Sequence, residues 1–153
     1  MAAIGKIIDS NPVVGGRTTN QILDTWKDGI FLKKEDITRN IKGLRSPQIG
    51  AVYAVLSHWE ISSDPATVVM PTGTGKTEVM LSLLIAATCS KTMIIVPTDA
   101  LRTQISNKVA SLGLLSNPQF GLIKETVLKP IVGVMSHRPC SAEEAIAFME
   151  QCN

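Results

Sequence analysis

The stretch MPTGTGKTEVMLSLLIAATC, from Met70 to Cys89, constrains the fold of this chain more than any other segment. Its first half consists almost entirely of small residues, and its second half is a nearly unbroken apolar run. The residues just before the loop, Thr67–Met70, are mostly β-branched and typical of a buried strand. Because the apolar run must be buried, the sequence predicts a strand, a tight glycine loop and a core helix in succession.

Gly73–Thr77 read G-T-G-K-T and stand where that helix would begin. A helix N-terminus has N–H groups without intrahelical acceptors, and glycines let a loop bring such groups close to a phosphate. Lys76 would reach the β- and γ-phosphates of a nucleoside triphosphate, and the Thr77 hydroxyl would coordinate Mg²⁺. The strict pattern G-x-x-x-x-G-K-[ST] fails at its first position, Met70, which supports the base of the loop. The alternative is a glycine turn that binds nothing.

Three apolar runs predict buried strands, because both faces of a parallel sheet are covered by helices. They are Thr67–Met70, Thr92–Val96 and Ile131–Met135. Strands that alternate with helices predict an α/β fold, with parallel strands and flanking helices.

Helix caps and apolar spacing predict the helices. Thr98 can cap one helix, and Ser141 with Glu144 has capping-box spacing for the last. Residues 1–16 are expected to be a loose lead-in, and residues 114–130 a long connection. In the third helix, Ser46 is the expected N-cap, Pro47 the first helical residue, and Ile49, Val52, Leu56 and Trp59 the buried stripe. The expected helical segments are Thr18–Gly29, Lys33–Gly43, Ser46–Glu60, Glu78–Cys89, Asp99–Leu112 and Ser141–Cys152.

Three stretches together resemble a known family. MPTGTGKT is similar to motif I of the superfamily 2 helicases and translocases, which work on DNA or RNA. IIVPTDALRTQ, Ile94–Gln104, resembles their motif Ia, and LRSPQ, Leu44–Gln48, resembles their adenine-reading glutamine motif. Within the superfamily the chain is most similar to the DEAD/DEAH-like branch that includes restriction-enzyme motor subunits. The resemblance covers about Leu44–Leu112 and implies an incomplete RecA-like domain that binds ATP and Mg²⁺.

The resemblance also implies particular roles. Gln48, with Arg45 beside it, would bind the adenine edge, Lys76 would be the catalytic residue, and Thr77 the metal ligand. Each role has a plainer alternative: Gln48 and Arg102 as solvated surface residues, Thr98 as a helix cap only, and Trp59 as core and no base-stacking platform. The residues implied to hold the nucleotide are Arg45, Gln48, Thr72, Gly73, Thr74, Gly75, Lys76, Thr77 and Glu78. Those implied to lie along the nucleic-acid backbone are Pro97, Thr98 and Arg102.

Hydrolysis in this family requires a strand that ends in Asp-Glu and an arginine from a second RecA-like domain. Asp-Glu does not occur after Pro97. We therefore expect residues 1–43 to be a helical N-terminal extension and 44–153 a partial RecA-like ATP-binding domain that stops before the Walker B motif. The chain would be a fragment of a longer protein or a truncated reading frame, and would bind ATP weakly without turning it over. A second RecA-like domain would be the missing partner.

Two other functions remain open from the sequence. A different P-loop enzyme, such as a kinase or GTPase, is opposed by PTDALRTQ, which has no role in those enzymes. The second open function is that of a non-enzymatic remnant that binds nucleotide or a partner. The formal net charge of +2 does not by itself indicate nucleic-acid binding, although DNA is the favoured partner. Three widely spaced cysteines and no apolar leader or membrane-length run indicate a cytoplasmic protein, with no membrane partner.

Overall fold

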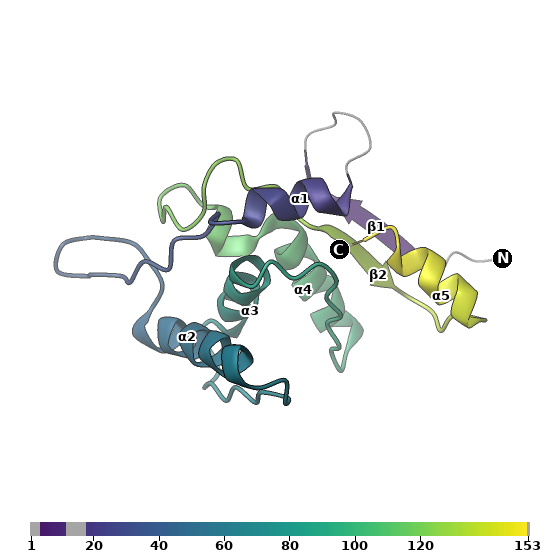
Figure 1. The fold of residues 1–153 in the computed structure, drawn as a ribbon, viewed down its shortest axis with the longest axis horizontal. Coiled ribbons are helices and arrows are strands. Elements are labelled where there is room, and N and C mark those ends of the chain that lie inside the picture. Colours follow the sequence, from purple (N-terminus) through teal and green to yellow (C-terminus); the bar gives the residue numbers. More distant parts are fainter. Residues whose placement is uncertain (1–3, 12–17, 153) are drawn as a thin grey trace.

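The computed structural model describes residues 4–11 and 18–152. Within that part of the chain lie five α-helices, one short 3₁₀ helix and a two-stranded sheet (Figure 1). The sheet lies to one side with helix α5, and the other helices gather beside it (Figure 1). In chain order the elements are β1 (Gly5–Asp9), α1 (Thr19–Trp26), α2 (Ser46–Ile61), α3 (Lys76–Ala86), α4 (Asp99–Ser111), η1 (Gly113–Ser116), β2 (Ile131–Met135) and α5 (Ala142–Met149).

The sheet corrects the expectation of parallel strands. β2 is a strand as predicted, but it pairs antiparallel with β1, in a register that runs from Gly5 opposite Met135 to Asp9 opposite Ile131. β1 lies in the segment that was expected to be a loose lead-in, so that expectation was wrong for Gly5–Asp9. The fold therefore has α/β content, and the sheet among the described residues is antiparallel.

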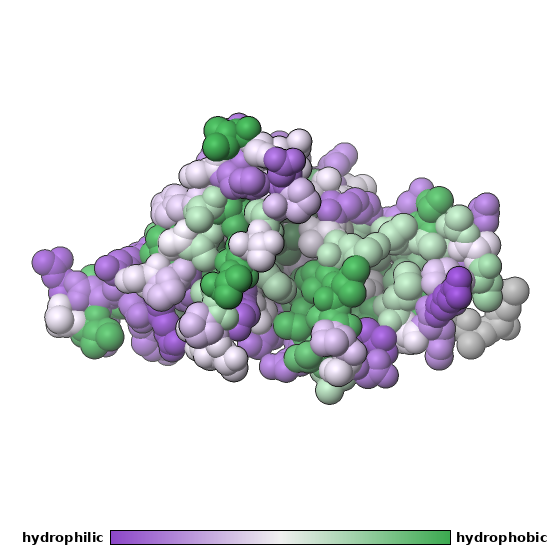
Figure 2. All heavy atoms as spheres, turned by 90° about the horizontal axis from the view of Figure 1, so that it is seen from below, coloured by the Kyte–Doolittle hydropathy of each residue, from purple (hydrophilic) through white to green (hydrophobic). Residues whose placement is uncertain are grey.

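The other two predicted strands, Thr67–Met70 and Thr92–Val96, have no strand structure. In the described part of the chain, no backbone hydrogen bond joins either segment to another. Most of their apolar side chains are open to solvent, with Val69 89% and Ile95 86% exposed, whereas Met70 is buried. Apolar side chains also gather visibly on the face shown in Figure 2. A β-branched run becomes a strand only where a neighbour supplies hydrogen bonds, and here the described residues supply none.

The predicted helix Lys33–Gly43 is also wrong. The segment forms a hairpin-like turn with bridges between Lys34 and Leu44 and between Asp36 and Ile41, and it projects at the left of Figure 1. The Asp36 carboxylate accepts hydrogen bonds from the Thr38 hydroxyl at 2.6 Å and from its backbone N–H at 3.0 Å. These bonds, with one from the Arg39 N–H, lower the pKa of Asp36. A short acidic side chain that binds nearby N–H groups stabilises a turn in place of a helix.

Helices α1, α4 and α5 begin where their caps predicted them, whereas α3, expected over Glu78–Cys89, runs from Lys76 to Ala86. The Thr18 hydroxyl accepts the Gln21 N–H at the start of α1, and the Thr98 hydroxyl accepts the Leu101 N–H at the start of α4. Ser141 caps α5 in the same way, by accepting the Glu144 N–H at 3.2 Å. In α2 the expected cap was one residue late. Ser46 is already helical and the residue before it is the N-cap.

Two clusters of buried side chains hold the helices together. The larger one joins α1, α3, α4 and the connection after η1, and includes Trp26, Leu81 and Ile85. The smaller one consists of Val52 on α2 with Met70 and Val79 on either side of the glycine loop. Trp59 was expected in the core but is 47% exposed, because α2 turns Gln48, Val52 and Val55 inward. No helix in the described ranges is long and apolar enough to cross a membrane.

Candidate nucleotide-binding site

Helix α3 anchors the glycine loop. Leu81, Leu84 and Ile85 on this helix are buried in the larger core, as the apolar run predicted. The loop ends at Gly75, the N-cap of α3, which has φ +85° and ψ +47°; Gly73 has φ +81°. Residues with a side chain rarely adopt this left-handed conformation, so glycine is required at both positions. The core therefore fixes the helix, and the two glycines let the chain turn tightly into it.

The loop is also closed by bonds of its own. The Pro71 carbonyl accepts the Thr74 hydroxyl at 2.6 Å, the Thr74 N–H at 3.4 Å and the Lys76 ammonium at 3.0 Å. The Lys76 side chain is exposed and reaches back across the loop. An exposed ammonium that holds a single carbonyl can exchange this acceptor for a phosphate at little cost, because water competes for the same bond.

The first backbone N–H groups of α3 are free of protein acceptors. Val79 is the first residue of the helix whose N–H is bonded, to the Gly75 carbonyl at 3.3 Å. In the described part of the chain, no hydrogen bond engages the backbone N–H groups of Gly75, Lys76, Thr77 or Glu78. Four successive free N–H groups at the positive end of a helix dipole form a site for an anion such as a phosphate.

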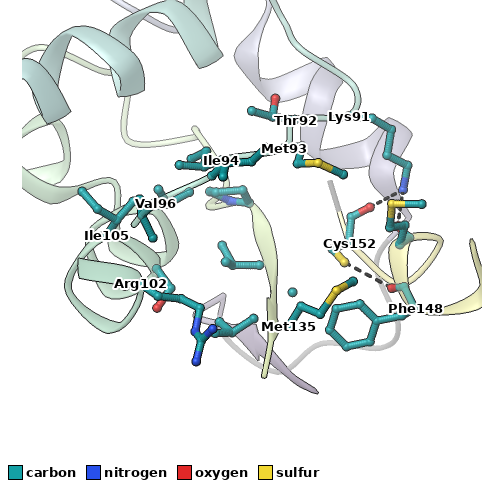
Figure 3. Close-up of a pocket in the computed structure, with 18 of the residues that line it drawn as sticks. Lys91, Thr92, Met93, Ile94, Val96, Arg102, Ile105, Met135, Phe148 and Cys152 are labelled. Carbon is teal, nitrogen blue, oxygen red and sulfur yellow. Dashed lines mark hydrogen bonds between the residues drawn. The ribbon is translucent and has the colours of Figure 1, made fainter. Parts of the chain in front are cut away.

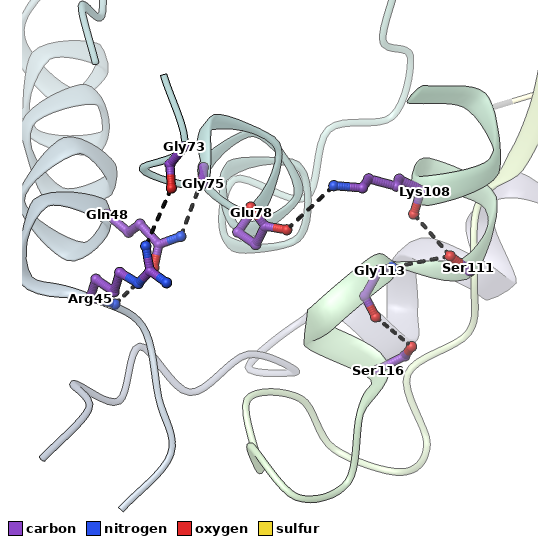
Figure 4. Close-up of polar contacts among 9 residues, drawn as sticks. All are labelled: Arg45, Gln48, Gly73, Gly75, Glu78, Lys108, Ser111, Gly113 and Ser116. Atoms are coloured by element: carbon purple, nitrogen blue, oxygen red, sulfur yellow. Dashed lines mark hydrogen bonds and ion pairs between the residues drawn. The ribbon is translucent and has the colours of Figure 1, made fainter. Parts of the chain in front are cut away.

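Arg45 and Gln48, from the start of α2, hold the other side of the loop (Figure 4). The Arg45 guanidinium donates to the Gly73 carbonyl at 3.3 Å, and the Gln48 side-chain nitrogen donates to the Gly75 carbonyl at 3.3 Å. The Gln48 side chain also closes the start of α2, since its oxygen accepts the Arg45 N–H at 2.7 Å. The structure thus unites the predicted residues of the glutamine motif with the predicted loop.

Glu78 links the loop helix to α4. Its carboxylate lies 3.9 Å from the Lys108 ammonium, and its side chain is only 14% exposed (Figure 4). Sequence reasoning did not select Lys108, because no spacing or motif relates it to a loop about 30 residues earlier. The ion pair places one positive and one negative group beside Gly75, where they affect the charge that a ligand encounters.

The predicted nucleic-acid residues lie at the start of α4. Pro97 and Thr98 are exposed, and Thr98 caps the helix. Arg102 is 36% exposed and forms an ion pair with Asp99 at 3.0 Å. These polar contacts stay within the first turn of α4, and the ion pair that joins α4 to the loop helix comes from Lys108 on the same helix.

A cavity of about 510 Å³ lies between Thr92–Val96, α4, β2 and α5 (Figure 3). Apolar side chains dominate its lining, and Arg102 and Lys91 lie at its margin (Figure 3). Lys91 donates to the carbonyls of Met149 and Cys152, at the end of α5. Burial raises the pKa of the Cys152 thiol, against the opposing effects of Lys91 and the Gly133 N–H. An apolar lining suits no triphosphate, so this cavity is separate from the loop site.

A glycine loop that leads into a buried helix, with Lys76 and Thr77 as its first residues and free N–H groups in its first turn, is an arrangement that can bind an anion such as a phosphate. Comparison with known families agrees with a site of this kind. The profile described as "Type III restriction enzyme, res subunit" matches residues 41–130, more than half of the chain. The chain therefore belongs to this family, which is a family of helicase-like ATPases. Neither a curated protein nor a solved structure matches the chain.

Proposed function

We propose that this chain supplies the ATP-binding part of a nucleic-acid-dependent ATPase, a helicase or translocase of superfamily 2. The proposal places residues 44–153 in a partial RecA-like domain of the DEAD/DEAH-like branch and treats residues 1–43 as an extension. The observation that carries it is the row of free N–H groups from Gly75 to Glu78, at the end of a glycine loop inside the region of the family match.

The loop is open at Gly73. A Cβ atom placed on this residue would meet no heavy atom within 4 Å. On the side of α2, by contrast, the loop is closed by Arg45 and Gln48. In this proposal the backbone of Thr72–Gly75 surrounds the phosphates, Lys76 binds the β- and γ-phosphates, and Thr77 holds Mg²⁺. The bound metal would neutralise phosphate charge.

The proposal retains Glu78 in the nucleotide site. Its carboxylate belongs to the first turn of α3 and faces Lys108 at 3.9 Å, so the ion pair offsets the negative charge that would otherwise oppose a triphosphate. The proposal assigns Glu78 and Lys108 to the wall of the site. Lys76 is then the positively charged side chain that can move to contact the phosphates of the ligand.

For nucleic acid, the proposal assigns the backbone contacts to Pro97, Thr98 and Arg102, with DNA favoured over RNA. The ion pair between Arg102 and Asp99 is solvent-exposed, and such pairs contribute little to stability. Arg102 can therefore exchange Asp99 for a phosphate at low cost. Contacts of this kind fix position along the backbone and carry no base information, as a motor on any sequence requires.

Nucleotide binding tests the proposal directly. Titration calorimetry with Mg-ATP should show binding by the whole chain, and Lys76→Ala should weaken it by roughly 10- to 150-fold, the worth of a hydrogen bond to a charged group. Lys124→Ala is the matched control, because Lys124 is exposed and remote from the loop in sequence. Absence of ATP binding, or equal affinity in Lys76→Ala and the parent chain, contradicts the proposal.

The nucleic-acid part has its own test. Binding of single- and double-stranded DNA and of RNA is measured by fluorescence anisotropy over a range of salt concentrations. Arg102→Ala should weaken binding uniformly across sequences and reduce the salt slope by about one, since one phosphate contact is removed. Arg138→Ala, an exposed arginine outside the family match, serves as the control. An unchanged slope in Arg102→Ala would remove Arg102 from the interface.

A further inference from the structure

The side chain of Gln48 is held in place by the protein itself. It is buried, with 4% of the residue exposed. Its oxygen accepts the Arg45 N–H at 2.7 Å, and its nitrogen donates to the Gly75 carbonyl at 3.3 Å (Figure 4). Both functional atoms of the amide therefore have partners inside the molecule.

An amide side chain reads adenine with the same two atoms. Its nitrogen donates to one ring nitrogen of the base while its oxygen accepts from the exocyclic amine. Gln48 has a second N–H and a second oxygen lone pair, but only 4% of the residue is exposed, so a base could reach them only if the side chain left the Arg45 N–H and the Gly75 carbonyl. That movement gives up two internal bonds for two bonds to the base, so little selectivity for adenine remains.

Packing against the loop opposes such a movement. A Cβ atom on Gly75 would lie 2.0 Å from the Gln48 side-chain nitrogen, so the amide lies directly against the glycine backbone. Arg45 makes the parallel contact with the Gly73 carbonyl at 3.3 Å. The start of α2 thereby engages the two loop carbonyls whose negative ends would repel a phosphate, while the N–H groups of Gly75 to Glu78 stay free.

We infer that Arg45 and Gln48 are positioning residues that shape the loop for a polyphosphate, and that the site discriminates little among nucleobases. The inference rests on the proposed function, since it concerns the same loop, and it departs from the adenine-reading role that the resemblance implies for Gln48. The recognised chemistry is the Mg²⁺-bound triphosphate group, whichever base is attached to it.

Competition among ligands tests the claim that the site discriminates little among nucleobases. ATP, GTP, CTP and UTP, each with Mg²⁺, should bind with affinities within about threefold of one another, which is less than the roughly fivefold worth of a typical hydrogen bond. Inorganic tripolyphosphate should displace ATP, and adenosine should not. An affinity for ATP more than about tenfold above that for GTP would overturn the inference, because that ratio requires a specific contact with the base.

Substitution tests the claim that Gln48 positions the loop. Gln48→Ala and Gln48→Glu should lower the affinity for ATP and for GTP by the same factor, about 2- to 12-fold, the worth of one hydrogen bond. Gln104→Ala and Gln104→Glu are the matched controls on the exposed surface of α4. An adenine-reading role would change the ATP-to-GTP affinity ratio in the Gln48 variants, whereas a positioning role would leave it unchanged, so this ratio is measured in every variant. Circular dichroism shows which variants are folded.

The outcomes test the proposed function and the inference about Gln48 separately. Loss of ATP binding alone in Gln48→Ala, with GTP unaffected, would make Gln48 an adenine reader and leave the proposed function standing. Unchanged affinity for both nucleotides would remove Gln48 from the site. If a Gln48 variant does not fold, the competition series on the parent chain still decides base selectivity. If neither nucleotide nor tripolyphosphate binds the parent chain, the proposed function and the inference both fail.

Discussion

Replacing Gly75 by alanine should damage the loop more than replacing Gly73 does. Both glycines have left-handed backbone conformations, at φ +85° and φ +81°. The surroundings of the added methyl group differ, because a Cβ on Gly75 lies 2.0 Å from the Gln48 nitrogen and 3.1 Å from its Cδ, whereas a Cβ on Gly73 meets nothing within 4 Å. The pair of variants therefore separates backbone strain from the contacts of the added methyl group, which at Gly75 are with Gln48 and, at 2.9 Å, with the Glu78 carboxylate.

The magnitudes follow from these geometries. The left-handed conformation costs an alanine about 1–2 kcal/mol, and Gly73→Ala should lose that much stability. Gly75→Ala must also displace Gln48 from the Gly75 carbonyl and the Arg45 N–H, two hydrogen bonds of about 0.5–1.5 kcal/mol each. Its total cost should be about 2–5 kcal/mol, of which about 1–3 kcal/mol arises from Gln48.

Urea denaturation followed by tryptophan fluorescence measures both costs, because Trp26 is buried in the larger core. The double variant Gln48→Ala/Gly75→Ala completes a double-mutant cycle. Removing the Gln48 amide should relieve the clash, so the two substitutions together should cost about 1–3 kcal/mol less than the sum of their separate costs. The reasoning is refuted if Gly75→Ala costs no more than Gly73→Ala, or if the cycle shows strict additivity.

Three further predictions concern the fold outside the loop. Thr25→Val should destabilise the fold by about 1–3 kcal/mol in thermal denaturation, because the Thr25 hydroxyl accepts the Leu128 N–H at 3.0 Å and its loss leaves that donor unpaired; an unchanged midpoint would contradict this. Ser141→Ala should cost about 0.5–2 kcal/mol as a lost helix cap, whereas Ser136→Ala, at an exposed serine outside the helices, should cost almost nothing; equal costs would argue against the cap. Burial raises the pKa of the Cys89 and Cys152 thiols, so their thiolates are scarce at neutral pH, and iodoacetamide should label the exposed Cys140 first, with Cys89 and Cys152 reacting only as pH rises into the alkaline range. The same shifts favour the folded state fully below the unfolded thiol pKa, and that contribution is lost as pH rises through the folded values. Peptide mass spectrometry across pH checks the order of labelling, and early labelling of Cys152 would be the contrary result.

Local signals in the sequence predicted the local structure well. Thr18, Thr98 and Ser141 each have a hydroxyl that accepts an N–H of the first turn, so their caps depend only on residues three positions away. The glycine loop and α3 were equally predictable, because two glycines and an apolar run determine a tight turn and a buried helix without help from distant residues.

Pairing between distant residues was not predictable from pattern. Thr67–Met70 and Thr92–Val96 have the composition of strands, but composition does not state which segment will pair with them, and in the described residues none does. Gly5–Asp9 looked like a lead-in and became a strand because β2 lies beside it. In Lys33–Gly43, the hydrogen bonds of the Asp36 carboxylate outweighed a modest helix propensity.

The candidate site was likewise predictable only in part: its residues could be predicted, but the contacts between them could not. The sequence predicted which residues belong to the loop, and Arg45 and Gln48 were selected as nucleotide-binding residues. Their bonds to the Gly73 and Gly75 carbonyls were not foreseen, because a motif gives residue types and spacing but no orientation of side chains. Lys108 was missed for a related reason, since its contact with Glu78 depends on how α4 packs against α3.

The antiparallel pairing of β1 with β2 also affects the order of folding during synthesis. Gly5 leaves the ribosome about 130 residues before its partner Met135 is made. At ordinary rates of translation β1 must wait on the order of ten seconds before its partner is made. The buried residues of the core around α3 end at Val127, so much of this core can form while β1 is still without a partner. The sheet would then assemble after that core has begun to form.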